Sequence, residues 1–147
     1  MRVRNQMSKQ SGVMLLEALI GILLFSIGVL GIVSLQASSM KAGADATYRI
    51  EAGYLGNQII GQMWADKANL PAYSLNATGA PCTAGANISN NPNVSGWIND
   101  MSRLPGSGNL QQQIVVIPAS NLVTVTVCWL PPKSPNPHKL VVSSSIN

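Results

Sequence analysis

The feature that most constrains this chain is an unbroken apolar run near its N-terminus, from Val13 to Leu35. These 23 residues hold a single charged side chain, Glu17. As a helix the run would extend about 35 Å, which is enough to cross a hydrocarbon core of roughly 30 Å. It is longer than the apolar region of about 7–15 residues in a secretory signal peptide. We therefore predict that the run crosses a membrane as one helix.

The formal net charge of +4 is concentrated in front of this run. Arg2, Arg4 and Lys9 precede it, whereas beyond residue 12 six basic residues face five acidic ones, a net charge of +1. Basic residues beside a span favour the cytoplasmic side, so we expect the N-terminus in the cytoplasm and the rest of the chain outside. The nearly neutral remainder has no basic stripe interleaved with aromatic residues, so no specific nucleic-acid partner is expected.

Glu17 is the residue that a simple membrane anchor does not explain. A carboxylate within a span costs up to a few kcal/mol and usually has a partner. The plainer interpretation is that Glu17 lies close enough to the end of the span to reach the headgroup region. The residues before it suggest a second interpretation, because Glu17 is the fifth residue after Gly12, where the basic leader ends.

A short basic leader that ends in Gly, followed by an apolar helix with an acid at its fifth position, resembles the class III signal of type IV prepilins and type II secretion pseudopilins. The resemblance implies that a prepilin peptidase cuts between Gly12 and Val13 and that the new amine of Val13 is methylated. It also implies that this amine pairs with Glu17, one turn away or on a neighbouring subunit, during filament assembly. Pairing would relieve the cost of the buried charge.

Two further segments are similar to one branch of this superfamily, the minor pilins of the type IV pilus modification protein (PilV) family. They are Phe25–Gly31, followed by Leu35-Gln36-Ala37, and Gln58–Asp66. The resemblance implies a minor pilin that primes pilus assembly with other minor pilins and the major pilin, moves from the inner membrane to the pilus tip, and supports twitching motility and adhesion. Its other partners would be the prepilin peptidase and the inner-membrane assembly machinery. A type II secretion minor pseudopilin and a tip-located module that binds a surface or DNA are the alternatives.

Beyond the apolar run, apolar residues recur every three or four positions, which is typical of a helix packed on one side. This stripe consists of Ala44, Tyr48, Ala52, Leu55, Ile59 and Met63. Because no proline occurs from residue 13 to 70, we expect one continuous helix from about Val13 to about Lys67. Asn69 and Pro71 would end it.

The remaining residues predict a small head. Residues 71–96 have the composition of a surface loop, and a helical turn with Trp97, Met101 and Leu104 on one face follows. Three runs have strand character: Gln113–Ile117, Leu122–Leu130 and Lys139–Ser145. We predict an α+β, type IV pilin-like fold, with an antiparallel sheet of about three strands (about 111–146) on the C-terminal half of the helix. In the central strand Val123, Val125, Val127 and Trp129 would face that helix, and Thr124, Thr126 and Cys128 would lie on the other face.

The chain would thus comprise a prepilin leader (1–12), a transmembrane and filament-core helix (13–40) and a periplasmic head (41–147). The head would contain the C-terminal half of the helix at 41–67. Two cysteines, Cys82 and Cys128, fall in this head. Outside the cytoplasm such a pair is expected to form a disulfide, with two free thiols as the alternative.

Enzymatic chemistry has little support in the sequence. His138 is the only histidine, so neither a metal site nor a nucleophile–histidine pair can be assembled, and no carboxylates are paired outside the helix. We therefore expect no enzyme and no cofactor. Asn76, Asn87 and Asn93 begin matches to the N-glycosylation pattern, which we attribute to the composition of the loop.

Overall fold

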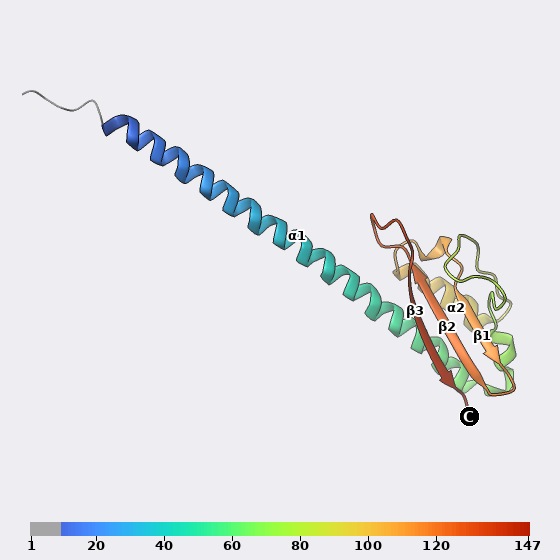
Figure 1. Ribbon diagram of the computed structural model, residues 1–147. Helices are drawn as coiled ribbons and strands as arrows, with labels where there is room; N and C mark the ends of the chain where they lie inside the picture. The colour runs from blue at the N-terminus through green and yellow to red at the C-terminus, as the bar shows by residue number, and fades with distance from the viewer. Residues whose placement is uncertain (1–9) are drawn as a thin grey trace, which may run out of the picture. The chain divides into compact units, whose positions relative to one another are not determined.

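The structure is a computed structural model that describes the backbone of residues 10–147 and the side chains from residue 12 onward. Residues 1–9 of the predicted leader lie outside the described residues. The chain divides into two compact units, of which the first ends at Gly43 and the second is Ala44–Asn147. One α-helix, α1 (Gln10–Ala65), begins in the first unit and ends in the second (Figure 1).

In the first unit, α1 has no packing partner within the described residues. Every side chain from residue 13 to residue 43 is exposed, and the apolar ones surround the helix on all sides. Phe25, for example, is 73% exposed. A helix that is apolar all round is suited to lipid or to other helices and not to water.

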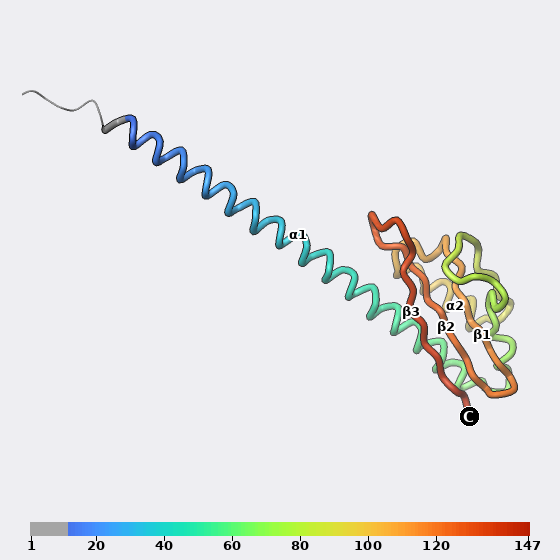
Figure 2. The backbone as a smooth tube through the Cα atoms, viewed as in Figure 1, coloured from blue at the N-terminus to red at the C-terminus, as the bar shows by residue number. Residues whose placement is uncertain are grey.

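The second unit has the predicted α+β architecture, in which an antiparallel sheet packs on the C-terminal part of α1 (Figure 2). The sheet has the order β1-β2-β3, formed by β1 (Gln113–Ile117), β2 (Leu122–Trp129) and β3 (His138–Ser145). Strand β2 ends one residue before the predicted Leu130, and β3 begins one residue before the predicted Lys139. This is the layout expected of a pilin-like fold.

The core of this unit lies between α1 and the sheet. Ala52, Leu55, Ile59 and Met63 of the predicted stripe are fully buried, and Tyr48 is partly buried against them. Ala44 is exposed, so the stripe begins one turn later than predicted. Four residues of β2 are buried on the sheet side of this core, as predicted: Val123, Val125, Val127 and Trp129.

A glycine sets how closely the sheet approaches the helix. A Cβ atom placed on Gly56 of α1 would lie 3.1 Å from Cγ2 of Val142 in β3 and 3.8 Å from Cγ2 of Val127 in β2. The first distance is shorter than an ordinary van der Waals contact, so a side chain here would push β3 away from α1. Gly56 therefore fixes the close packing of the sheet on the helix.

The end of α1 differs slightly from the prediction. The α-helix ends at Ala65 instead of about Lys67, and a 3₁₀ segment, η1 (Lys67–Tyr73), continues past Asn69 and Pro71. Asn69 leaves helical geometry at φ −112° and ψ 20°, and proline has no N–H to donate to a regular helical hydrogen bond. The tighter segment turns the chain so that Tyr73 is buried in the core.

The predicted loop 71–96 is too long, because helix α2 (Pro92–Asp100) begins inside it. The Asn91 side chain caps this helix: its Oδ1 accepts hydrogen bonds from the backbone N–H of Asn93 at 2.9 Å and of Val94 at 3.4 Å. Pro92 follows at the first helical position, where its missing N–H costs nothing. Two short 3₁₀ segments come next, η2 (Met101–Arg103) and η3 (Ser107–Asn109). The predicted apolar face is buried and consists of Trp97, Met101 and Leu104.

Candidate functional site

The first candidate site is the N-terminal part of α1. This helix is the one in the described part of the chain that is long and apolar enough to cross a membrane. One polar group in the span is satisfied within the helix: the Ser26 hydroxyl donates a hydrogen bond to the carbonyl oxygen of Ile22, at 2.7 Å. Such a bond to the preceding turn removes most of the cost of placing a hydroxyl in lipid.

The structure places Gly12, Val13 and Glu17 in the same helix, within two turns of one another. Val13 and Glu17 are four residues apart, so they share one helix face. The Glu17 side chain has no hydrogen bond or ion pair with any residue from 12 to 147. The Glu17 carboxylate can therefore pair with a cation that does not belong to residues 12–147.

The two cysteines of the head form a disulfide, Cys82–Cys128, with their Cα atoms 5.3 Å apart. It ties the loop before α2 to the end of β2 and closes a loop of about 46 residues, which in the chain-entropy model stabilises the head by a few kcal/mol. Cys128 and Thr126, on the β2 face opposite the helix, are buried as well. That face of β2 is therefore covered at its C-terminal end.

The disulfide is supported by a buried glutamine that no sequence pattern marks. Gln112 is fully buried, and its Oε1 accepts a hydrogen bond from the Cys128 N–H at 2.7 Å while its Nε2 donates to the Cys128 carbonyl at 3.0 Å. Its side-chain amide thus pairs with β2 as a backbone peptide would. An amide buried with both ends bonded is costly to replace, because its partners would be left unsatisfied.

The asparagines of the three glycosylation-like patterns have structural roles. Asn76 Nδ2 donates to Asn87 Oδ1 at 3.1 Å and to the Gln112 carbonyl at 2.9 Å. Asn87 Nδ2 donates to the Leu110 carbonyl at 2.8 Å, and Asn93 Nδ2 donates to the Tyr73 hydroxyl. Each amide nitrogen that a glycan would occupy is already engaged, so these residues hold the loops of the head in place.

His138 contacts a charged and an aromatic side chain. It is the first residue of β3, and its Nδ1 lies 3.1 Å from Asp45 Oδ1, 93 positions earlier in the chain. Asp45 also forms an ion pair with Arg49 at 3.1 Å, and the His138 ring meets the Trp129 ring edge-on at 5.8 Å. Within the described residues no group of three or more His, Cys, Asp or Glu could hold a metal ion.

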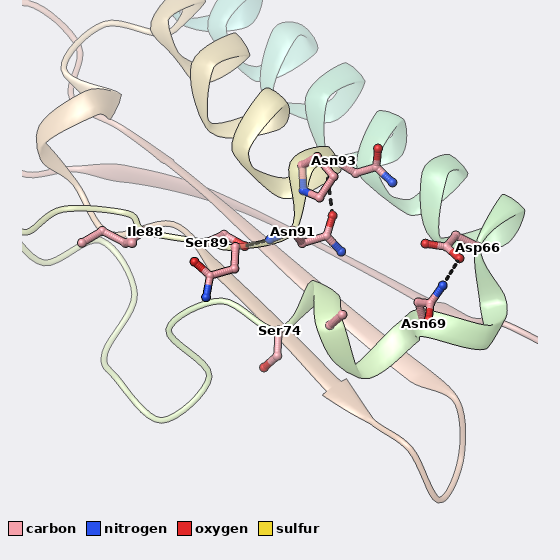
Figure 3. Close-up of a pocket in the computed structure, with 10 residues that line it drawn as sticks. Asp66, Asn69, Ser74, Ile88, Ser89, Asn91 and Asn93 are labelled. Carbon is pink, nitrogen blue, oxygen red and sulfur yellow. Dashed lines mark hydrogen bonds between the residues drawn. The ribbon is translucent and has the colours of Figure 1, made fainter.

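The second candidate site is a pocket of about 630 Å³ at one end of the head (Figure 3). Its lining comes from three segments: Asp66 after α1, residues 69–74 in and just after η1, and residues 88–93 at the start of α2. Side-chain amides and hydroxyls dominate this lining. No sequence pattern marks the pocket, because these segments meet only through the turn at η1.

A buried tyrosine is hydrogen-bonded to two of the residues that line the pocket, Asp66 and Asn93. The Tyr73 hydroxyl lies 3.2 Å from Asp66 Oδ2 and 2.6 Å from Asn93 Nδ2. Burial raises the pKa of this hydroxyl; the hydrogen bond from Asn93 opposes that effect, and the hydrogen bond to the Asp66 carboxylate adds to it. The hydroxyl therefore stays protonated, donates to Asp66 and fixes the carboxylate at the pocket wall.

Comparisons of the chain with models of known families, with curated proteins and with solved structures find no match.

Proposed function

We propose that this chain is a minor pilin of a type IV pilus, a structural and assembly subunit. The observation that carries the proposal is Glu17, the single carboxylate of an apolar helix, placed five residues after Gly12 and left without a partner among the described residues. A carboxylate within a membrane span is costly without a partner, so Glu17 requires a cation that the described residues do not supply. The disulfide-bonded α+β head that follows suits an oxidising compartment outside the cytoplasm.

In this proposal the chain first sits in the inner membrane, with its leader in the cytoplasm and its head in the periplasm. A prepilin peptidase removes residues 1–12 and leaves a new amine on Val13, which is then methylated. That amine is a cation at the start of α1, on the same face as Glu17. Pairing of the amine of one subunit with Glu17 of another would satisfy both charges and set the axial register of the subunits.

The partners in this proposal are other minor pilins and the major pilin, which contact the chain through the apolar part of α1. The inner-membrane assembly machinery would move the chain out of the bilayer into a pilus, where it would lie at the tip. A complex of minor pilins that primes assembly would support twitching motility and adhesion. The head requires no cofactor for this role.

The second candidate function is that of a minor pseudopilin in type II secretion. The same leader, helix and carboxylate favour it, because both systems build filaments from such helices. Deletion of the gene separates the two: loss of surface pili and twitching with normal secretion of exoproteins is the expected result. Loss of secretion with normal piliation would overturn the pilus assignment in favour of the secretion system. A strain that carries the wild-type gene on a plasmid is the control and must recover the lost activity.

A further inference from the structure

The pocket in the head has a mainly polar lining with one carboxylate. Asp66 is its one ionisable residue, and both carboxylate oxygens are already engaged: Oδ1 accepts from Asn69 Nδ2 at 2.7 Å and Oδ2 from the Tyr73 hydroxyl. No Lys or Arg lines it. An anionic ligand would meet a carboxylate without a compensating cation, and a metal ion would find a single carboxylate, already hydrogen-bonded, as its one charged ligand. The lining therefore disfavours anionic ligands and metal ions.

Several amides and hydroxyls in this lining have hydrogen-bonding capacity to spare. The side chains of Ser74 and Asn90 are exposed and make no hydrogen bond within the described residues. Asn91 uses its Oδ1 to cap α2, which leaves its two amide N–H donors, and Asn93 keeps its Oδ1 as an acceptor. Donors and acceptors are thus interspersed around one cavity. Sugar hydroxyls, which both donate and accept, match such a set.

The rim adds an apolar contact. Ile88 is 82% exposed, and in Figure 3 it lies on the loop across from the η1 segment. Pro92 and Ala72 also line the cavity. Apolar side chains beside amides and hydroxyls can pack against the C–H face of a pyranose ring while the polar groups bind its hydroxyls. A volume of about 630 Å³ also falls within the range of roughly 300–1,000 Å³ that is typical of small-ligand pockets.

We propose that this pocket binds a short neutral oligosaccharide. The segments around it fit a sugar better than a peptide. Extended peptides pair with the free edge of a strand, and helical peptides lie in apolar grooves. Here the lining consists of a 3₁₀ segment, a loop and a helix start, with no strand, and it is mainly polar. The proposal goes beyond the role in pilus assembly, and neither depends on the other.

The test uses the full chain in micelles of a zwitterionic detergent, because a sugar-headed detergent would compete for the pocket. The probes are a printed panel of neutral, sialylated and sulfated oligosaccharides and a panel of extended peptides. We expect binding to neutral members of the glycan panel that persists in 0.5 M NaCl, since no ion pair is involved. Binding to peptides alone, a preference for charged glycans, or no binding at all would overturn the proposal.

A pocket variant and a matched control locate the binding. Ser74→Ala combined with Asn90→Ala removes two exposed side chains that have no partners in the head, so the fold should be retained. Their loss is expected to weaken binding of the best neutral glycan roughly tenfold or more. Asn99→Ala removes an exposed amide of α2 outside the pocket and should bind as the wild type does. Equal affinity of the pocket variant and the wild type would contradict the assignment of this site.

Discussion

Replacement of Glu17 with alanine is expected to abolish incorporation of the chain into pili while leaving its membrane insertion intact. Insertion depends on the apolar run, which loses an unfavourable charge in this variant and becomes a better span. Assembly depends on the carboxylate, because in the proposed filament each Glu17 balances the amine of another subunit. Without it, that amine would stay buried and unpaired, at a cost of several kcal/mol.

The measurement is the amount of the chain in sheared pili relative to the amount in the inner membrane. Glu17→Gln separates charge from size and should fail as alanine does. The matched control is Glu51→Ala, which removes a carboxylate farther along α1, where Glu51 forms a partly exposed ion pair with Arg103 at 3.5 Å. Such pairs contribute little, so this variant should be incorporated normally. Normal incorporation of Glu17→Ala would refute the proposed charge pairing.

Replacement of Trp97 with alanine is expected to destabilise the head by about 3–5 kcal/mol. Trp97 of α2 is 1% exposed and belongs to the core of the head. Its indole N–H donates a hydrogen bond to the Leu55 carbonyl at 2.8 Å, so the substitution removes both a large packed ring and a polar link between the two helices. Domains of this size are stable by only about 5–15 kcal/mol. The variant therefore loses a large share of the head's free energy of unfolding.

The measurement is the thermal midpoint of the full chain in detergent, followed by near-ultraviolet circular dichroism, which reports the packing of the head's aromatic residues. A decrease on the order of 10–20 °C is expected. Trp64→Ala is the matched control, because Trp64 is 42% exposed and lies outside the buried core, with the ammonium group of Lys67 4.8 Å from its ring centre. It should shift the midpoint by only a few degrees. Equal shifts for the two variants would contradict this account of the core.

Local periodicity explains why much of the fold could be predicted from the sequence. The alternation from Val123 to Trp129 marks a strand with one face toward the core, and the three-to-four spacing from Tyr48 to Met63 marks the helix face beneath it. In both cases the spacing of apolar residues along the chain indicates which face of the element is buried. The strand limits were therefore accurate to within one residue.

Contacts between distant residues explain what could not be predicted. The start of α2 depends on the Asn91 cap and Pro92, but asparagine and proline are equally typical of the loop around them. Two contacts join residues that are distant in the chain: His138 pairs with Asp45, and Gln112 is buried against Cys128. No local sequence pattern predicts either contact. The pocket likewise exists only once η1 brings residue 66 close to residues 88–93.

Mass spectrometry of the N-terminus tests whether the chain is processed as a prepilin. The chain is purified from cells with and without the prepilin peptidase. With the peptidase, we expect a protein that lacks residues 1–12 and begins at a methylated Val13; without it, the full N-terminus should remain. An unprocessed chain in both strains would contradict the assignment to the pilins.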